Sequence, residues 1–230
     1  NRQRQVEDGA PAERTLNIPN GIDLPRMEKV RAARGEGIPH TACLIGRVVP
    51  IKDVKTFLRA MRTLVNEIPD AKGWIAGPED EDKDYAAECR ALVSSLGLEK
   101  NVEFLGFQKI DELLPKVGVI VLSSISEALP LVLLEGFAAG VPAVSTDVGS
   151  CRQLIEGLDE EDRAFGKAGS VVGIADPEAL GKAVAHLLKN PDTWHQAQQA
   201  GIRRVENLYT QQQMFGSYRA LYQGLLGEDS

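Results

Sequence analysis

From Thr41 onward, short apolar runs alternate with longer segments in which apolar residues recur every three or four positions. An apolar run of about four to eight residues has the length of a buried strand, whereas recurrence every three or four residues is typical of a helix with one buried side. Strands that alternate with helices form βα units wound onto a parallel sheet. The alternation therefore predicts an α/β fold, with a parallel sheet of about six strands flanked by helices.

The alternation also gives approximate bounds for the elements. Strands are expected over residues 41–46, 73–76, 102–105, 117–122, 142–145 and 170–172. Helices are expected over residues 52–67, 84–96, 150–157, 177–189, 192–209 and 211–226, with one more that begins near Pro130. Pro69 and Gly97 follow the first two helices and are residues that commonly end a helix.

Three parts of the chain are expected. Residues 1–40 are expected to form a lead-in and interdomain segment, because they precede the first strand and begin with a polar stretch without periodicity. Residues 41–206 are expected to form the sheet domain, and residues 207–230 a closing helix. One side of this helix carries apolar residues, namely Met214, Tyr218, Leu221, Tyr222 and Leu225. Such a side requires something to cover it.

The net charge and the cysteine content limit the possible binding partners and the cellular compartment of the protein. The chain has 26 Lys and Arg against 33 Asp and Glu, a net charge of −7, and no basic stripe, which disfavours nucleic acid as a main partner. Cys43, Cys89 and Cys151 are an odd number without metal-ligand spacing, which predicts free structural thiols in a reducing compartment. No apolar run reaches the roughly eighteen residues of a membrane span, and the chain opens on Asn1 without a leader pattern. We therefore expect a cytoplasmic chain cut from a longer protein.

The first candidate functional residues follow the first expected strand. Ligands of an open parallel sheet lie beyond the carboxyl ends of its strands. Gly46 and Arg47 come directly after the first strand, and Lys52 lies at the start of the next helix. Two cations beside the unpaired N–H groups of a helix start suit a phosphate. Taken alone, this motif is weak, and two solvent-facing basic residues remain the alternative.

A second set follows the fourth strand. Glu127 lies in the loop, and Glu135, eight positions later, lies in the helix that begins near Pro130. Because one carboxylate lies in the loop and the other in the helix, both can approach the same ligand from different levels of the site. The amides of the helix N-terminus would then lie between them. Apolar neighbours of Glu135 predict a partly buried carboxylate that needs a partner such as sugar hydroxyls. A helix-start carboxylate at Glu127 and an exposed helical face at Glu135 remain the alternatives.

Other common ligand motifs do not occur in the sequence. It lacks the GxGxxG dinucleotide pattern, the GxxxxGK phosphate loop and the GxSxG pattern of a serine nucleophile. The histidines are too far apart in the sequence for a metal site, so structural or surface roles are predicted for His40, His186 and His195.

Taken in order, several motifs resemble those of the retaining enzymes of glycosyltransferase family 4, which have the two-domain GT-B fold. The motifs are NGID at 20–23, Gly46-Arg47 with Lys52, VEFLGF at 102–107, SEALPLVLLEGFAAGVP at 126–142 with its Glu-x7-Glu spacing, and TDVG at 146–149. The resemblance spans residues 16–222 and implies the Rossmann-like, donor-binding C-terminal half of such an enzyme. The phrases IGRVVPIKD, SISEALPLVLLE and DVGSCRQLIE are closer to the cytoplasmic glycosyltransferases of the Pel exopolysaccharide pathway.

The resemblance implies a role for each candidate residue. Arg47 and Lys52 would hold the donor diphosphate and offset the charge of the leaving group, so that no metal or other cofactor is required. Glu127 would contact the transferred sugar, and these three residues are the expected catalytic set. Glu135 would accept hydrogen bonds from the ribose hydroxyls. Further donor contacts are expected from Gly46, from amides at Leu131 and Val132, and from Phe107 to Lys109 beside the base.

The resemblance also implies partners. The donor would be a UDP-sugar, with UDP-glucose the first expectation, and the acceptor a growing exopolysaccharide held by a missing N-terminal domain. The full-length protein would work within a membrane-associated polysaccharide synthesis complex, and the present chain alone would bind donor with little or no turnover. Asp53 and Ala128 stand where the family often has glycine, which leaves the loop details open. Two alternatives stay open as well: a module that binds a nucleotide sugar or a protein without reacting, and half of a nucleotide-sugar epimerase.

Overall fold

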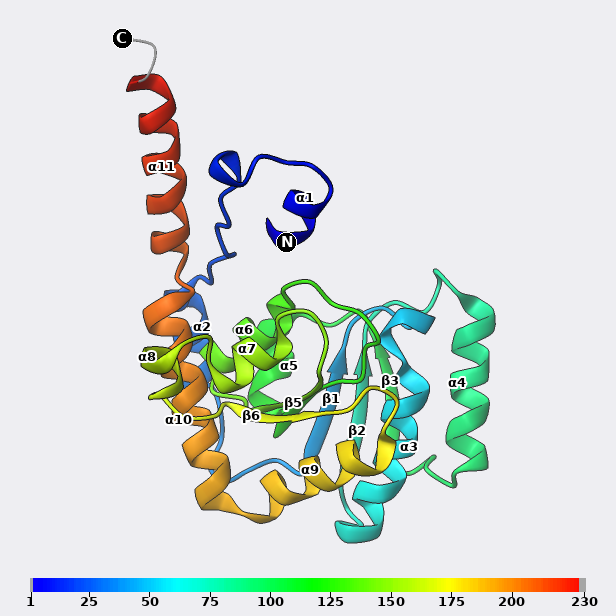
Figure 1. Ribbon diagram of the computed structural model, residues 1–230. Helices are drawn as coiled ribbons and strands as arrows, with labels where there is room; N and C mark the ends of the chain where they lie inside the picture. Colours follow the sequence, from blue (N-terminus) through cyan, green and yellow to red (C-terminus); the bar gives the residue numbers. More distant parts are fainter. Residues whose placement is uncertain (1, 228–230) are drawn as a thin grey trace.

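The computed structural model describes the backbone of residues 2–227 and the side chains of residues 5–224. Its centre is a six-stranded parallel sheet with helices on both faces (Figure 1). The strands are β1 Thr41–Ile45, β2 Lys72–Ala76, β3 Val102–Gly106, β4 Val119–Leu122, β5 Ala143–Thr146 and β6 Gly169–Val172. The predicted α/β class and the six parallel strands are confirmed.

Each predicted helix is present, with bounds shifted by a few residues. The long helices are α2 Leu24–Ala32, α3 Val54–Glu67, α4 Lys83–Ser95, α6 Leu131–Ala138, α9 Pro177–Lys189, α10 Pro191–Leu208 and α11 Gln211–Gly227. Shorter ones are α1 Arg2–Glu7, α5 Ile110–Leu113, α7 Cys151–Glu156 and α8 Glu160–Arg163, with 3-10 turns η1 Ala12–Arg14, η2 Pro50–Lys52 and η3 Leu114–Lys116. Helices α1, α2, α5 and α8 were not predicted from the sequence.

The sheet order is β3-β2-β1-β4-β5-β6. The chain winds outward from β1 to β3, then returns to the middle and pairs β4 with β1, in register at Ala42 with Val119 and Cys43 with Ile120. The connections after β1 and β4 therefore leave the sheet in opposite directions. A crevice opens at such a reversal, and ligands of doubly wound sheets bind there.

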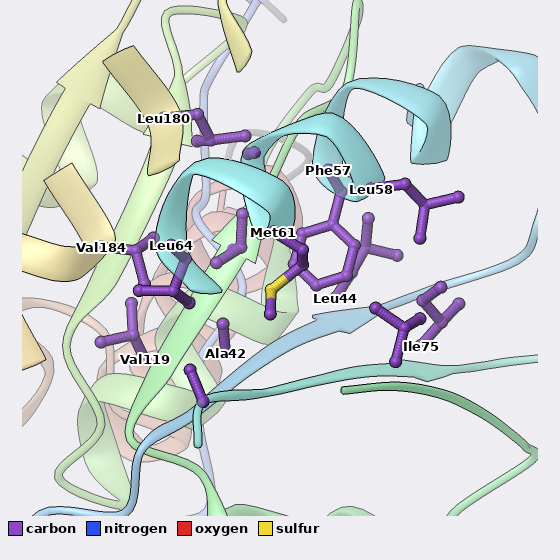
Figure 2. Close-up of a cluster of buried hydrophobic side chains, with 14 of the residues drawn as sticks. Ala42, Leu44, Phe57, Leu58, Met61, Leu64, Ile75, Val119, Leu180 and Val184 are labelled. Carbon is purple, nitrogen blue, oxygen red and sulfur yellow. The ribbon is translucent and has the colours of Figure 1, made fainter. Parts of the chain in front are cut away.

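The sheet is buried on both faces, which explains why the sequence of each strand is a continuous apolar run. On one face, α3 lays Phe57, Met61 and Leu64 against the sheet, and Val184 of α9 packs beside them (Figure 2). The opposite face is covered by α2, α5, α6 and α7. The packing is close: a Cβ at Gly73 in β2 would lie 2.8 Å from the Met61 sulfur, so only glycine fits beneath α3 without movement.

Asp53 shows how the loop after β1 accommodates a residue other than glycine. Its backbone is left-handed, with φ 44° and ψ 52°, a conformation that glycine adopts most easily. The Asp53 side chain accepts a hydrogen bond from the Thr56 amide at 3.3 Å and so caps α3. This capping bond offsets the backbone strain, and the helix begins at Val54 rather than at the predicted residue 52.

The three cysteines are buried and free, as predicted. Burial raises the pKa of the Cys43 and Cys151 thiols, and it raises that of Cys89 to about 11. All three therefore remain protonated and act as small apolar residues of the core.

The segment expected as a lead-in contains α2, which buries Met27 and Val30 against the face of the sheet covered by α6. At the other end of the chain, α11 projects away from the sheet (Figure 1, red). Exposed apolar side chains lie along it at Phe215, Tyr218, Leu221 and Tyr222, whereas the Leu225 side chain lies outside the described residues.

A buried ion pair fixes the short helix α8. Arg204 of α10 is fully buried, and its guanidinium bonds to the Asp162 side chain. Its other N–H groups donate to the carbonyls of Leu154, Ile155, Asp162 and Gly166 at 2.8–3.1 Å. All five guanidinium donors are thus used, which is the condition under which a buried arginine is tolerated.

We predict that Arg204→Met lowers the free energy of unfolding by about 3–5 kcal/mol, because it leaves the Asp162 carboxylate buried without its cation. Arg203→Met is the matched control, since Arg203 is exposed, and it should change stability by no more than about 0.5 kcal/mol. Urea unfolding measures both values. Equal effects of the two substitutions would contradict the assignment of Arg204 as a structural centre.

Candidate functional site

An ion pair joins the two loops that diverge at the strand-order reversal. Lys52 Nζ, after β1, lies 2.6 Å from Glu127 Oε1, after β4. The same carboxylate oxygen accepts a hydrogen bond from Ser124 Oγ at 2.7 Å. The side chains are only 23% and 12% exposed, so solvent screens the pair weakly. Lys52 and Glu127, 75 residues apart in the chain, therefore meet at the crevice predicted for a ligand.

The backbone around Glu127 is held by the neighbouring loops. The Ile125 amide donates to the Ile51 carbonyl at 3.0 Å, and the Ser150 amide donates to the Ala128 carbonyl at 2.9 Å. Gly149, with φ 53°, lies so close that a Cβ there would be 2.2 Å from the Glu127 carbonyl oxygen. The loops after β1, β4 and β5 consequently form one interlocked unit that fixes Glu127.

The two departures from the family pattern have different structural outcomes. Asp53 occupies a left-handed position, as described above. Ala128 does not, because Asp53 and Ala175 are the non-glycine residues with positive φ among those described. Alanine therefore replaces glycine at position 128 without backbone strain.

Arg47 lies at the same edge of the sheet but is already paired. Its Nη1 atom lies 2.6 Å from both carboxylate oxygens of Glu81, in the loop after β2, and both side chains are about half exposed. Gly46, directly before it, adjoins Lys52, whose Cε would lie 3.4 Å from a Cβ at position 46. The structure thus brings Gly46, Arg47 and Lys52 together at the end of β1.

Glu135 lines a hollow of about 260 Å³ whose lining residues do not include Lys52 or Glu127. Its lining includes Asn20, Arg26, Leu131, Glu135 and Met214. Burial raises the pKa of Glu135, and the positive charge of Arg26 partly opposes this effect. None of the described residues donates a hydrogen bond to the Glu135 carboxylate. It is a half-buried acceptor, next to the NGID motif, that a ligand hydroxyl could satisfy.

The first turn of α6 connects the two parts of the site. Pro130 is its N-cap residue and makes no side-chain capping bond, so the amides of Leu131 and Val132 are not capped by a side chain. The Leu131 side chain is exposed and lines the Glu135 hollow, whereas Val132 packs against the core. The helix dipole adds partial positive charge at this turn. It can therefore stabilise an anion at the start of α6.

Exposed apolar side chains accompany the charged ones at this edge of the sheet. Phe107, two residues after Leu105 in β3, is 81% exposed, and Ile51, Ile125 and Leu131 are each nearly half exposed. Phe107 and Leu131 were predicted as site residues from the sequence, whereas Ile51 and Ile125 were not. These two lie in connections that follow strands, Ile51 in η2 after β1 and Ile125 in the loop after β4. Of these residues, Ile51 and Ile125 are joined by a backbone hydrogen bond, and exposed apolar groups beside shielded charges are a feature of binding surfaces.

Within the described part of the chain, no three His, Cys, Asp or Glu side chains are grouped so that they could hold a metal ion. The three histidines are exposed, and His40 lies 3.3 Å from Asp70. This agrees with the predicted surface roles. No helix among the described residues has both the length and the apolar character needed to cross a membrane.

The family model described as glycosyl transferases group 1 matches residues 28–204. The chain is 35% identical over 180 residues to an exopolysaccharide phosphotransferase of Streptomyces coelicolor. The matched region covers 73% of this chain and 18% of that protein. The chain spans less than two thirds of the length of the curated relatives that it matches.

Two solved structures share the fold. One is Alr3699/HepE of Anabaena in complex with UDP and glucose, at a TM-score of 0.80 and 18% identity, covering 98% of this chain and 60% of that one. The other is the C-terminal domain of the group 1 glycosyl transferase LpcC of Francisella tularensis, at a TM-score of 0.65 and 20% identity. The match with LpcC covers 84% of this chain and 97% of the solved domain.

We predict that Glu135→Gln raises the urea midpoint of unfolding at pH 7 but not at pH 3.5. Burial raises the pKa of this carboxyl in the folded state, so its ionisation destabilises the fold as the pH rises through that pKa. Below the pKa of an unfolded glutamate, about 4.3, both states are protonated and glutamine gives no advantage. Glu112→Gln, at an exposed position, is the control and should change neither midpoint. An equal gain at both pH values would contradict a buried, ionising Glu135.

Proposed function

The chain belongs to the glycosyl transferases of group 1, and from this membership we propose that it is the donor-binding domain of a retaining, family 4 type glycosyltransferase. The donor is a UDP-sugar. The observation that carries the proposal is the Lys52–Glu127 pair at the strand-order reversal, with the uncapped first turn of α6 beside it. This arrangement provides a cation, amide donors and a carboxylate within one crevice.

Each candidate residue has a proposed role that follows from its surroundings. Lys52 and the first-turn amides of α6 bind the diphosphate, and Arg47 adds a second positive charge at the mouth of the crevice. These groups stabilise the negative charge that develops on the diphosphate as the sugar departs, so no metal ion is needed for this step. Glu127 positions Lys52 and contacts the transferred sugar.

The outer contacts hold the nucleoside. Glu135 lacks a hydrogen-bond donor among the described residues and is suited to accept bonds from the two ribose hydroxyls. Phe107 offers an exposed aromatic face to the base from the end of β3. Crystal structures of Anabaena Alr3699/HepE with UDP, and with UDP-glucose, support this class of donor for the shared fold.

The acceptor site belongs to a part of the protein outside this chain. The fold covers 97% of a solved structure that is itself a C-terminal domain, which supports the assignment of this chain as the C-terminal half of a GT-B enzyme. We propose that residues 41–206 form the donor domain and that the apolar side of α11, in residues 207–230, packs on an N-terminal acceptor domain. Residues 1–40 connect the two, and α2 within them packs on the donor domain.

We propose that the complete protein is a cytoplasmic hexosyltransferase that extends an exopolysaccharide of the Pel type within a membrane-associated complex, with UDP-glucose as the first donor to test. The three free, buried thiols support a reducing compartment. The similarity to a Streptomyces exopolysaccharide enzyme supports the class of pathway.

We predict that this 230-residue chain binds UDP with a Kd of about 1 mM or lower, corresponding to at least about 4 kcal/mol. Lys52→Gln should weaken binding at least about tenfold, since it removes a charge-assisted bond to phosphate. Lys55→Gln, three residues away and paired with Glu88, should bind as the wild type does. Isothermal calorimetry of the three proteins tests this. Folded protein that shows no binding at millimolar UDP would refute the proposed site.

We further predict that the chain alone binds UDP-glucose without transferring it, whereas the complete protein transfers glucose and loses at least about a hundredfold in kcat on Glu127→Gln. Radiolabel transfer to polysaccharide measures this rate. Full activity of the variant would mean that Glu127 is misassigned, or that this domain only binds the nucleotide sugar and the catalytic groups lie elsewhere in the protein. Conversion of the donor to another sugar without acceptor would instead identify an epimerase.

A further inference from the structure

The two cations of the crevice differ in how firmly their carboxylate partners hold them. Glu127 is shielded from solvent and is also held by Ser124, so its bond to Lys52 is part of a fixed network. Glu81 is half exposed, and Arg47 is its hydrogen-bond partner among the described residues. Exposed ion pairs contribute little free energy, so the Arg47–Glu81 pair can exchange partners easily whereas the Lys52–Glu127 pair cannot.

The position of Glu81 is fixed by its neighbours. The loop after β2 packs so tightly on the loop after β1 that a Cβ at Gly77 would lie 2.0 Å from the Gly46 carbonyl oxygen. The Val48 amide donates to the Pro78 carbonyl at 2.9 Å and joins the two loops again. On the far side, Asp82 caps α4 through the Tyr85 amide at 3.0 Å. Glu81 is thus held between two anchored points, beside Arg47.

A second carboxylate in the same loop behaves differently. Glu79 pairs with Arg90 of α4 at 2.8 Å, and the Arg90 guanidinium lies 4.4 Å from the centre of the Phe104 ring. This pair covers β3 and involves no residue assigned to the crevice. Of these two glutamates, Glu81 is therefore the one that engages a candidate phosphate-binding cation.

From this arrangement we infer that Glu81 is a built-in competitor of the donor diphosphate: its carboxylate occupies Arg47 in the free protein and is displaced when the diphosphate binds. The inference rests on the proposed nucleotide-sugar function. A diphosphate can take Arg47 only by breaking the contact with Glu81, and the displaced carboxylate stays near the incoming negative charge. Glu81 therefore lowers the affinity for phosphorylated ligands and has no effect on an uncharged nucleoside.

The test compares calorimetric Kd values for UDP and for uridine in the wild type, Glu81→Gln and Glu79→Gln. Both substitutions remove one negative charge from the same loop, so the second controls for the change in net charge. We expect Glu81→Gln to bind UDP about three- to fivefold more tightly, and Glu79→Gln to stay within about twofold of the wild type. Uridine should bind all three proteins equally.

A double-mutant cycle with Arg47→Ala isolates the contact. In the Arg47→Ala background, Glu81→Gln should lose most of its effect, because the contact that it relieves no longer exists. Unchanged or weaker UDP binding by Glu81→Gln, or an equal gain in Glu79→Gln, would overturn the inference while leaving the nucleotide site intact. Absence of UDP binding in the wild type and in Glu81→Gln alike would overturn the proposed function itself.

Discussion

A parallel sheet buried on both faces leaves only the ends of its strands for polar chemistry. In this protein two clusters of buried apolar side chains cover the two faces of the sheet. The charged side chains that could bind a ligand lie at the carboxyl ends of the strands. The reversal of strand order between β1 and β4 then decides which strand ends face a common space. Lys52 and Glu127 meet there because of topology, and their contact ties the outgoing and returning halves of the sheet together.

Most of the sheet could be predicted from the sequence, because burial on both faces leaves an apolar run at each strand. The missed helices lack such a signal. The segment of α8 is acidic and reads as a surface loop, and its anchor, Arg204, is a residue type that is rarely buried. Only the tertiary structure reveals that five hydrogen bonds make Arg204 part of the core. The start of α3 was predicted two residues too early, because an aspartate does not itself indicate a left-handed backbone, although the family often has glycine at this position.

The residues of the candidate site could be predicted from the sequence, but the contacts between their side chains could not. The edge that carries Arg47, Lys52 and Glu127 follows from strand ends alone. That Arg47 meets Glu81, and that Glu135 faces a hollow built from residues near both ends of the chain, depends on contacts across loops. Long-range side-chain pairing leaves no periodic trace in a sequence.

The interlocked loops after β1, β4 and β5 constrain how this architecture can diversify. Their backbones are bonded to one another at Ile51, Ile125, Ala128 and Ser150, so an insertion in any of them would shift the other two. Among the described residues, no backbone hydrogen bond joins the loop after β3 to these three loops, and this loop presents Phe107 at the surface. Changes in length and composition are tolerated best in that loop. The exposed ring of Phe107 can therefore be replaced with little effect on the interlocked loops.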